Sequence, residues 1–387
     1  MSFHCVSSLN YMVNNNISVT LQDLIDDVIF SLFFFFKSYT AVGSKVYGYD
    51  LRHTQSPSIT LQHDFHVSSL DGSEDINSID FVHIPKQKKT YLAAADGDGH
   101  VRITDSIPYR KNNDRIESGQ SSEASSSTQT LRTFQHSQDG SLALVTSLSF
   151  RPRSLKSIDM ATAGTDCTIC LWDINRPHNI PSSTLFIQQD NDENAAKAGV
   201  NQICNPPIVH SLSWSPSGRL LSAGLGDGTC LIATIDGRKI VESCRLRDGH
   251  SSAVASVLFP RFGLPSSYSH VTAEDRLMIS AGSDGSILLW DLGSQIAGRN
   301  AIDPSSIFAG CDDEYPKETD DGCTSTSIAM KQLSISQNNS QKILFGIPHS
   351  KKTNFMVCSS SEDFTLSNSL FVSDTSNDIT VYTLPML

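Results

Sequence analysis

The feature that most constrains this chain is a short opening that recurs four times. Each copy starts with a β-branched residue, has a serine two places later and an aromatic residue five places later, and is soon followed by proline. The copies are residues 76–81, 145–150, 209–214 and 254–259. Short apolar runs stopped by proline are typical of β-strands. Their repetition predicts a fold built from copies of one supersecondary unit.

A second motif follows each opening. It consists of two runs of apolar and small residues separated by a turn rich in aspartate and glycine, and its copies are residues 91–105, 160–173, 220–233 and 278–291. Such a turn between two β-type runs predicts a hairpin. The nearly continuous apolar character predicts strands that are covered on both faces. The fold class is therefore expected to be all-β.

The opening, the turn and the dipeptide Trp-Asp recur in one order, and this combination resembles the WD40 repeat family. The resemblance covers about residues 40–387 and implies a β-propeller, with one four-stranded sheet per blade around a central channel. We expect about six recognisable blades: a partial one at residues 41–50, the four full units, and a degenerate one made of residues 342–346, 369–374 and 378–382. Since the family implies about seven blades, the N-terminal blade is expected to be missing or truncated.

The domain is expected to span residues 39–387, with disordered or acidic insertions near 107–130, 188–204 and 294–340. Residues 1–38 are interpreted as an atypical segment outside it. Their apolar run at 28–36 is too short to cross a bilayer, which takes about 20 residues, and aspartates precede it where a secretory signal would be basic. Our preferred interpretation is an artefact of the gene model. A genuine hydrophobic anchor or interaction helix is the alternative.

Composition limits the choice of partners and compartment. The 387 residues include 29 Lys and Arg against 41 Asp and Glu, which gives a net charge of −12. An acidic surface repels phosphate groups, so neither nucleic acid nor an anionic membrane is expected as the main partner. The nine cysteines form no regular framework. This favours a reducing compartment, and we expect a cytoplasmic and/or nuclear protein.

No metal or other cofactor is expected. Cys167 and Cys170 are three residues apart on an expected strand, where they would point to opposite faces and could not hold one ion. The segment 96–99 resembles part of a calcium loop, but no glutamate closes it, so a hairpin turn is expected there instead.

Two repeat units carry a histidine, a hydroxyl residue, an aspartate and a tryptophan at matching spacing. They are His136, Thr162, Asp166 and Trp172 in one unit, and His250, Ser280, Asp284 and Trp290 in the other. The WD40 resemblance implies that these four side chains form a buried hydrogen-bonded chain that supports the blade. A hydrolase is disfavoured, because the set repeats and no Gly-x-Ser-x-Gly elbow occurs. Other units have Thr104, Ala233 or Tyr382 at the tryptophan position, and those blades are expected to depend on apolar packing alone.

The ends of the blades give the most specific hint about function. Propellers that serve as substrate receptors of cullin–RING ubiquitin ligases often end a blade in Trp/Tyr-Asp-x-Arg, and the arginine contacts the ligase adaptor. Tyr49, Asp50 and Arg52 fit this pattern, while Arg176 follows Trp172-Asp173 one place late. These four residues are the candidates for adaptor contact.

We therefore expect a non-enzymatic scaffold that binds proteins, with a role as a cullin–RING substrate receptor as the sharpest form of that hypothesis. A scaffold for chromatin or ribosome assembly is one alternative. An enzyme with a site in the mouth of the channel is another, and it would need convergent titratable residues that the sequence does not present. The acidic and serine-rich insertions are expected to be solvated surface, or else an acidic lip or phosphorylation region.

Overall fold

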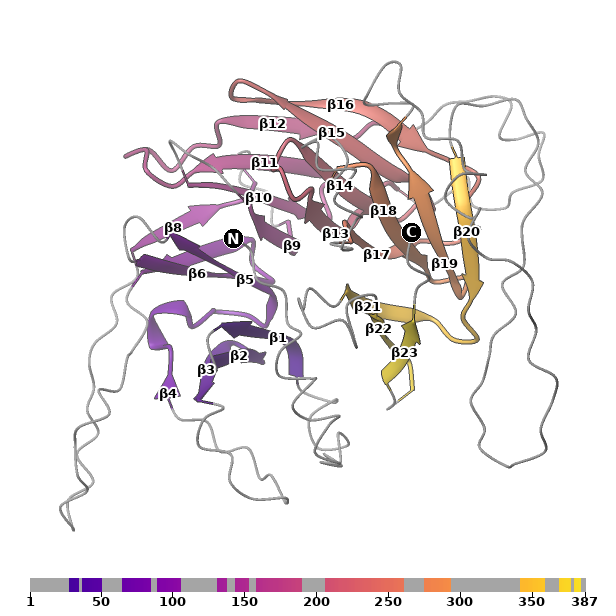
Figure 1. Ribbon diagram of the computed structural model, residues 1–387. Coiled ribbons are helices and arrows are strands. Elements are labelled where there is room, and N and C mark those ends of the chain that lie inside the picture. Colours follow the sequence, from indigo (N-terminus) through magenta and orange to yellow (C-terminus); the bar gives the residue numbers. More distant parts are fainter. Residues whose placement is uncertain are drawn as a thin grey trace, which may run out of the picture.

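The computed structural model describes residues 28–34, 37–50, 65–84, 89–105, 131–137, 143–152, 158–189, 206–260, 275–293, 342–358, 369–376 and 379–383. These residues form six antiparallel sheets that follow one another along the chain (Figure 1). Apart from one 3-10 turn, η2 (Ser68–Leu70), the described elements are strands. No helix among the described residues is long and apolar enough to cross a membrane.

The first five sheets each have four strands, and we number the sheets in chain order. Sheet 1 is β1 (Val28–Phe34), β2 (Lys37–Val42), β3 (Lys45–Asp50) and β4 (Phe65–His66). Sheet 2 is β5 (Ile76–Ile84), β6 (Lys89–Asp96), β7 (His100–Thr104) and β8 (Arg132–Gln135). Sheet 3 is β9 (Val145–Phe150), β10 (Asp159–Gly164), β11 (Thr168–Asp173) and β12 (Ser183–Phe186).

The remaining sheets complete the series. Sheet 4 is β13 (Val209–Trp214), β14 (Leu220–Leu225), β15 (Cys230–Asp236) and β16 (Lys239–Leu246). Sheet 5 is β17 (Val254–Leu258), β18 (Leu277–Gly282), β19 (Ser286–Asp291) and β20 (Lys342–Pro348). Sheet 6 has three described strands, β21 (Thr353–Cys358), β22 (Ser369–Asp374) and β23 (Ile379–Thr383).

The first strand of each sheet lies beside the first strand of the next, in the order β1, β5, β9, β13, β17 and β21. The sheets are therefore arranged around a common centre, with these six strands innermost (Figure 1). Each neighbouring pair of sheets encloses one cluster of buried apolar side chains. The middle strands are buried on both faces, as in β14 and β18. Small residues such as Ala161, Ala163 and Ala223 allow the sheets to approach closely at these positions.

The serine of the repeated opening links neighbouring sheets. Ser78 Oγ accepts a hydrogen bond from the Leu148 amide (3.1 Å), and Ser147 Oγ accepts one from the Leu212 amide (3.0 Å). Ser211 Oγ accepts the Val257 amide in the same way (3.2 Å). The innermost strands are sheet edges, so the N–H groups that point away from their own sheet have no strand partner. The recurring serine supplies an acceptor from the preceding sheet, which explains its fixed place in the repeat.

The blade count differs from the expected six. Five sheets have the four strands of a complete blade, and the sixth has three strands among the described residues. We expected residues 342–346 to open the last blade, but β20 pairs with β19 and forms the outer strand of sheet 5. The run itself is ambiguous, because any apolar strand can close one sheet or open another.

The incomplete sheet also lies at the opposite end of the chain from the expected one. Residues 41–50 were expected to be a partial blade, yet they belong to a four-stranded sheet in which β1 pairs with β2. The expected boundary at residue 38 thus falls inside β2, and the apolar run supplies strand β1. A run that is apolar throughout shows no strand period, so its sequence did not predict this pairing.

Candidate functional site

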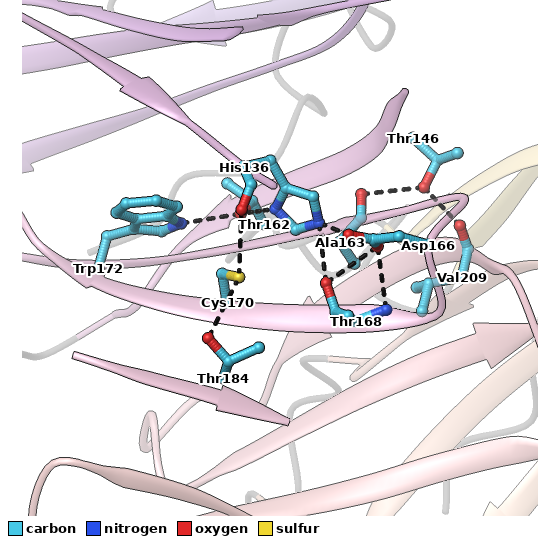
Figure 2. A network of polar contacts seen from close by, with 10 residues as sticks. All are labelled: His136, Thr146, Thr162, Ala163, Asp166, Thr168, Cys170, Trp172, Thr184 and Val209. Carbon is cyan, nitrogen blue, oxygen red and sulfur yellow. Dashed lines mark hydrogen bonds and ion pairs between the residues drawn. The ribbon is translucent and has the colours of Figure 1, made fainter. Parts of the chain in front are cut away.

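The best-defined polar network lies in sheet 3, and it brings together the four residues predicted there (Figure 2). Trp172 Nε1 donates a hydrogen bond to Thr162 Oγ1 (2.8 Å), which lies 2.8 Å from His136 Nδ1. His136 Nε2 lies 3.3 Å from Asp166 Oδ1. The network continues to Thr168, whose hydroxyl donates to Asp166 Oδ1 (2.9 Å) and lies 3.1 Å from His136 Nε2.

The environment of His136 favours its charged form. Burial by itself lowers the pKa of this imidazole, because a charge is poorly solvated inside the protein. The hydrogen bond and negative charge of Asp166, together with a contribution from Cys170, outweigh burial and raise the pKa of His136 to about 9. The same partnership lowers the pKa of the Asp166 carboxyl, although burial opposes that shift. At neutral pH the two side chains therefore form an ion pair that joins the turn between β10 and β11 to the segment after β8.

Sheet 5 contains the second predicted set in a closely similar arrangement. Trp290 Nε1 donates to Ser280 Oγ (2.7 Å), and Ser280 Oγ lies 2.6 Å from His250 Nε2. The other imidazole nitrogen, Nδ1, lies 2.8 Å from Ser286 Oγ and 3.5 Å from Asp284 Oδ1. Burial opposes ionisation of Asp284, but hydrogen bonds led by the one from His250 hold the pKa of its carboxyl well below the usual range.

Sheet 6 has a polar network that the sequence analysis missed. His349 Nε2 lies 2.9 Å from Asp374 Oδ2, and His349 Nδ1 lies 2.7 Å from the Tyr382 hydroxyl. The expectation that this blade depends on apolar packing alone is wrong. A signal was present in the sequence: Asp374 and Ser376 repeat the Asp-x-Ser/Thr spacing of the other hairpin turns. Tyrosine in place of tryptophan concealed it.

The first full repeat unit, in sheet 2, also has a buried polar group. Asp96 is fully buried and accepts hydrogen bonds from the His100 amide (2.9 Å) and from Arg102 Nη1 (2.6 Å). Gly99 N–H donates to Asp96 O (3.2 Å), so residues 96–99 form the predicted hairpin turn. Apolar packing alone therefore does not describe this sheet either.

The histidine networks are enclosed. The side chains of His136 and His250 are 0% exposed, and that of His349 is 3% exposed. A general base must reach the proton that it removes from a substrate. In these networks the imidazoles contact side chains of their own blades, and the geometry is that of internal support.

The cysteines also have structural surroundings. Cys167 occupies a hairpin turn with φ of 59°, while buried Cys170 lies in β11 with its sulfur 3.6 Å from Thr184 Oγ1. Burial raises the pKa of the Cys230 and Cys358 thiols to about 12, which keeps them neutral. Among the described residues, no three histidine, cysteine, aspartate or glutamate side chains form a group that could hold a metal ion.

Charged residues gather at the opposite ends of the strands from the hairpin turns. Arg276 makes a buried two-point contact with Asp291, with both N–O distances at 2.6 Å. Arg151 pairs with Asp159 (3.0 Å) and donates from Nε to Gly218 O in sheet 4 (2.6 Å). All four residues lie at one end of the sheets, where first and third strands end and second strands begin. We call this region the strand-end rim.

Three of the four adaptor candidates lie at this end of the strands. Tyr49 and Asp50 are the last residues of β3, and Arg52 lies outside the described residues. Arg176 follows β11, with Nε 3.4 Å from Asp173 Oδ2 and its side chain 36% exposed. Most of the acidic and serine-rich insertions also lie outside the described residues.

Comparisons with known proteins agree with this architecture. The family model described as "WD domain, G-beta repeat" (WD40) matches residues 128–173 and 201–232. These two segments thus match WD40 repeats, and the six sheets have the arrangement of a β-propeller. It is 23% identical over 354 residues to "WD repeat-containing protein 53 homolog" of Dictyostelium discoideum, covering 89% of this chain and 76% of that protein.

A solved structure has a similar fold. A chain in "Crystal Structure of Mitotic Checkpoint Complex" matches with a TM-score of 0.51 at 14% identity, covering 90% of this chain and 73% of that one. This similarity supports the propeller fold.

Proposed function

We propose that this chain is a non-enzymatic scaffold for protein binding and that it serves as a substrate receptor of a cullin–RING ubiquitin ligase. The strand-end rim is the adaptor-binding side in this proposal. Such a receptor acts in the cytoplasm and/or the nucleus, where its ligase partners and a reducing environment are found.

The observation that carries the proposal is the partly exposed arginine that follows a Trp-Asp blade end. Trp172 and Asp173 are fixed by the blade, while the Arg176 side chain remains 36% exposed. A guanidinium held at a defined position suits recognition of a partner carboxylate. The enclosed imidazoles favour binding over catalysis.

The test is affinity purification of the full chain from cells, followed by mass spectrometry. We expect a cullin-ligase adaptor in amounts comparable to the chain. The variant Arg52→Ala should weaken recovery of the adaptor without changing thermal stability. Adaptor-free purification would overturn the receptor role, and undiminished recovery with Arg52→Ala would remove Arg52 from the contact.

Two other functions predict different results. A scaffold for chromatin or ribosome assembly predicts those components in place of the adaptor. An enzyme in the channel predicts hydrolase turnover that His250→Ala abolishes while fold is retained.

A further inference from the structure

Sheet 6 exposes apolar side chains at positions that the other sheets bury. We call the face of sheet 6 that is directed away from sheet 5 the far face. We infer that the far face and the adjoining Lys352 bind an extended segment of a partner protein, which alternates apolar side chains and carries a carboxylate near one end. In the proposed receptor this segment belongs to a substrate, and the inference rests on the proposed function in that respect alone.

The strand register defines the far face. Two neighbouring rows of its side chains cross β21, β22 and β23, with Phe355, Ser373 and Ile379 in one row and Val357, Phe371 and Val381 in the other. The opposite face of the sheet packs against sheet 5 through residues such as Met356 and Leu370. The two rows of the far face are thus apolar apart from one serine, and they carry no charge.

Ile379 and Val381 are far more exposed than their counterparts in other sheets. They are 40% and 46% exposed. The side chains at the same two places in the third strands of sheets 2 to 5 are between 0% and 3% exposed, and they are Val101, Ile103, Ile169, Leu171, Cys230, Ile232, Ile287 and Leu289. Each of those pairs belongs to the apolar cluster shared with the next sheet. Among the described residues, no such cluster covers the far face.

Phe355 occupies the place of the serine that links neighbouring sheets. Sheets 2 to 5 have Ser78, Ser147, Ser211 and Ser256 at this place, and the first three accept an amide N–H of the next sheet. A phenyl ring does not supply that acceptor, and Phe355 is 50% exposed. The far face is therefore suited to apolar contact in place of the sheet-to-sheet link used elsewhere.

A positive charge adjoins the apolar rows. The carbonyl of exposed Lys352 accepts the Thr375 N–H (3.1 Å), two places beyond Ser373, so strand alternation puts Lys352 in the next row of the far face. Burial lowers the pKa of His210 in sheet 4, and the nearby charge of Lys352 lowers it further. No described residue forms an ion pair with Lys352. In a chain of net charge −12, this lysine favours a carboxylate on the partner.

The edge of sheet 6 is suited to an added strand. β23 pairs with β22 on one side, and no described strand pairs with its other side. The outer strands β8, β16 and β20 contain charged residues, and β4 and β12 have two and four residues. β23 has five residues and no charge, so it lacks the features that usually protect a sheet edge. Alternate side chains of an extended segment paired with β23 would lie beside Ile379 and Val381.

The size of the far face favours a short segment over a second copy of the chain. The three strands of sheet 6 have six, six and five residues. At the usual strand spacing and rise they present a face of roughly 250 Å². A stable dimer buries about 800 Å² on each partner. The far face alone is too small for that contact, whereas one added strand matches its length.

The first experiment selects ligands from a phage-displayed library of short random peptides, with the full chain as bait. We expect the enriched peptides to alternate apolar residues and to carry Asp or Glu near one end. Enriched peptides without this pattern, or no enrichment at all, would overturn the inference. A synthetic, fluorescently labelled copy of an enriched peptide is then used to measure affinity by anisotropy.

Matched variants test whether that peptide binds the far face. Val381→Arg should weaken binding about tenfold, because it places a charge against apolar side chains of the ligand. Val241→Arg is its control, since Val241 in β16 is also 46% exposed. Lys352→Glu should weaken binding about fivefold, with a smaller effect at high salt, and Lys239→Glu in β16 should not. Equal affinities within either pair would overturn the inference, and equal thermal midpoints show that the variants are folded.

Two other occupants of the far face give distinct results. A dimer in sedimentation experiments that Val381→Arg dissociates would assign the face to a second copy. A photoreactive benzoylphenylalanine at residue 381 of the full chain would cross-link to residues 1–27 if the chain covers its own face. Either result overturns the inference.

The binding measurement uses no ligase component, so the two proposals fail separately. An adaptor-free purification removes the receptor role and leaves the peptide result in place. Recovery of the adaptor without peptide binding at the far face removes only this inference.

Discussion

Sheets 3 and 6 each pair a histidine with an aspartate beside an aromatic residue, but the two sheets bury the aromatic residue differently. In sheet 3 the Trp172 and His136 side chains are 0% exposed. In sheet 6 Tyr382 is half-buried, and the neighbouring Phe355 and Val381 are 50% and 46% exposed. The imidazole–carboxylate pair is enclosed in both sheets, since Asp374 is 4% exposed and Asp166 is 21% exposed, so the difference lies in the aromatic residue and its surroundings.

The difference shows what a repeated motif contributes. A hydrogen bond in a dry, packed site is costly to break because its partners are left unsatisfied, whereas water can replace a lost partner at a half-exposed site. The comparison predicts that substitutions of the aromatic residue and of its hydroxyl group will have larger effects in sheet 3 than in sheet 6.

The largest expected effect comes from removing the aromatic residue. Trp172→Ala should lower the free energy of unfolding by about 3–5 kcal/mol, because it empties a fully buried site that also contacts Phe134 at 4.9 Å between ring centroids. Tyr382→Ala should cost about 1–2 kcal/mol, since part of the ring already contacts solvent. Urea denaturation monitored by circular dichroism measures both. Equal losses would contradict the role assigned to burial.

The next effect concerns pH and isolates the charge of His136. Its pKa is about 9 in the fold and about 6.5 in an unfolded chain, so folding stabilises the protonated form. This stabilisation is complete below pH 6.5 and is lost as pH rises through 9, a total of at most about 3 kcal/mol. The midpoint temperature of thermal unfolding should therefore decrease as the pH is raised from 6.5 to 9. His136→Gln, which cannot be charged, should show a flatter profile, and parallel profiles would refute the ion pair.

The smallest effects compare single hydroxyl groups. Thr162→Val should cost about 1–3 kcal/mol, because it leaves the Trp172 N–H and His136 without their shared partner inside the core. Tyr382→Phe should cost about 1 kcal/mol, because Tyr382 is half-buried, so water can replace its hydroxyl beside His349 Nδ1, and His349 keeps Asp374. Chemical denaturation of both variants beside the wild type provides the measurement. A larger loss in Tyr382→Phe would reverse the ranking of the two sheets.

Much of the fold could be predicted from the sequence because its repeats are local. The hairpins around Asp166 and Asp284 follow from turn chemistry and strand patterning. The predicted residues of both tryptophan networks also come together, since fixed spacing along a hairpin fixes their places. The network of Tyr382 was missed because tyrosine replaced the residue that marks the motif.

The candidate site was less predictable. Arg176 could be singled out from its place after Trp-Asp, but its exposure depends on the path of the turn. The hydrogen bonds of Arg132 to the carbonyl groups of Ile174 and Arg176 could not be read from the sequence, because Arg132 lies more than 40 residues from both. Its contacts form only when sheets 2 and 3 pack side by side.

The sequence by itself determined the repeating unit: strands that end at proline, hairpins at Asp/Gly turns, and a serine at a fixed place in each opening. These features depend on backbone conformation and alternation over a few residues. Only the tertiary structure decided that β1 completes sheet 1, that β20 closes sheet 5, and that Arg132 anchors the turn beyond β11. An apolar strand can pair with any compatible edge, so its partner is chosen by which sheets lie next to each other.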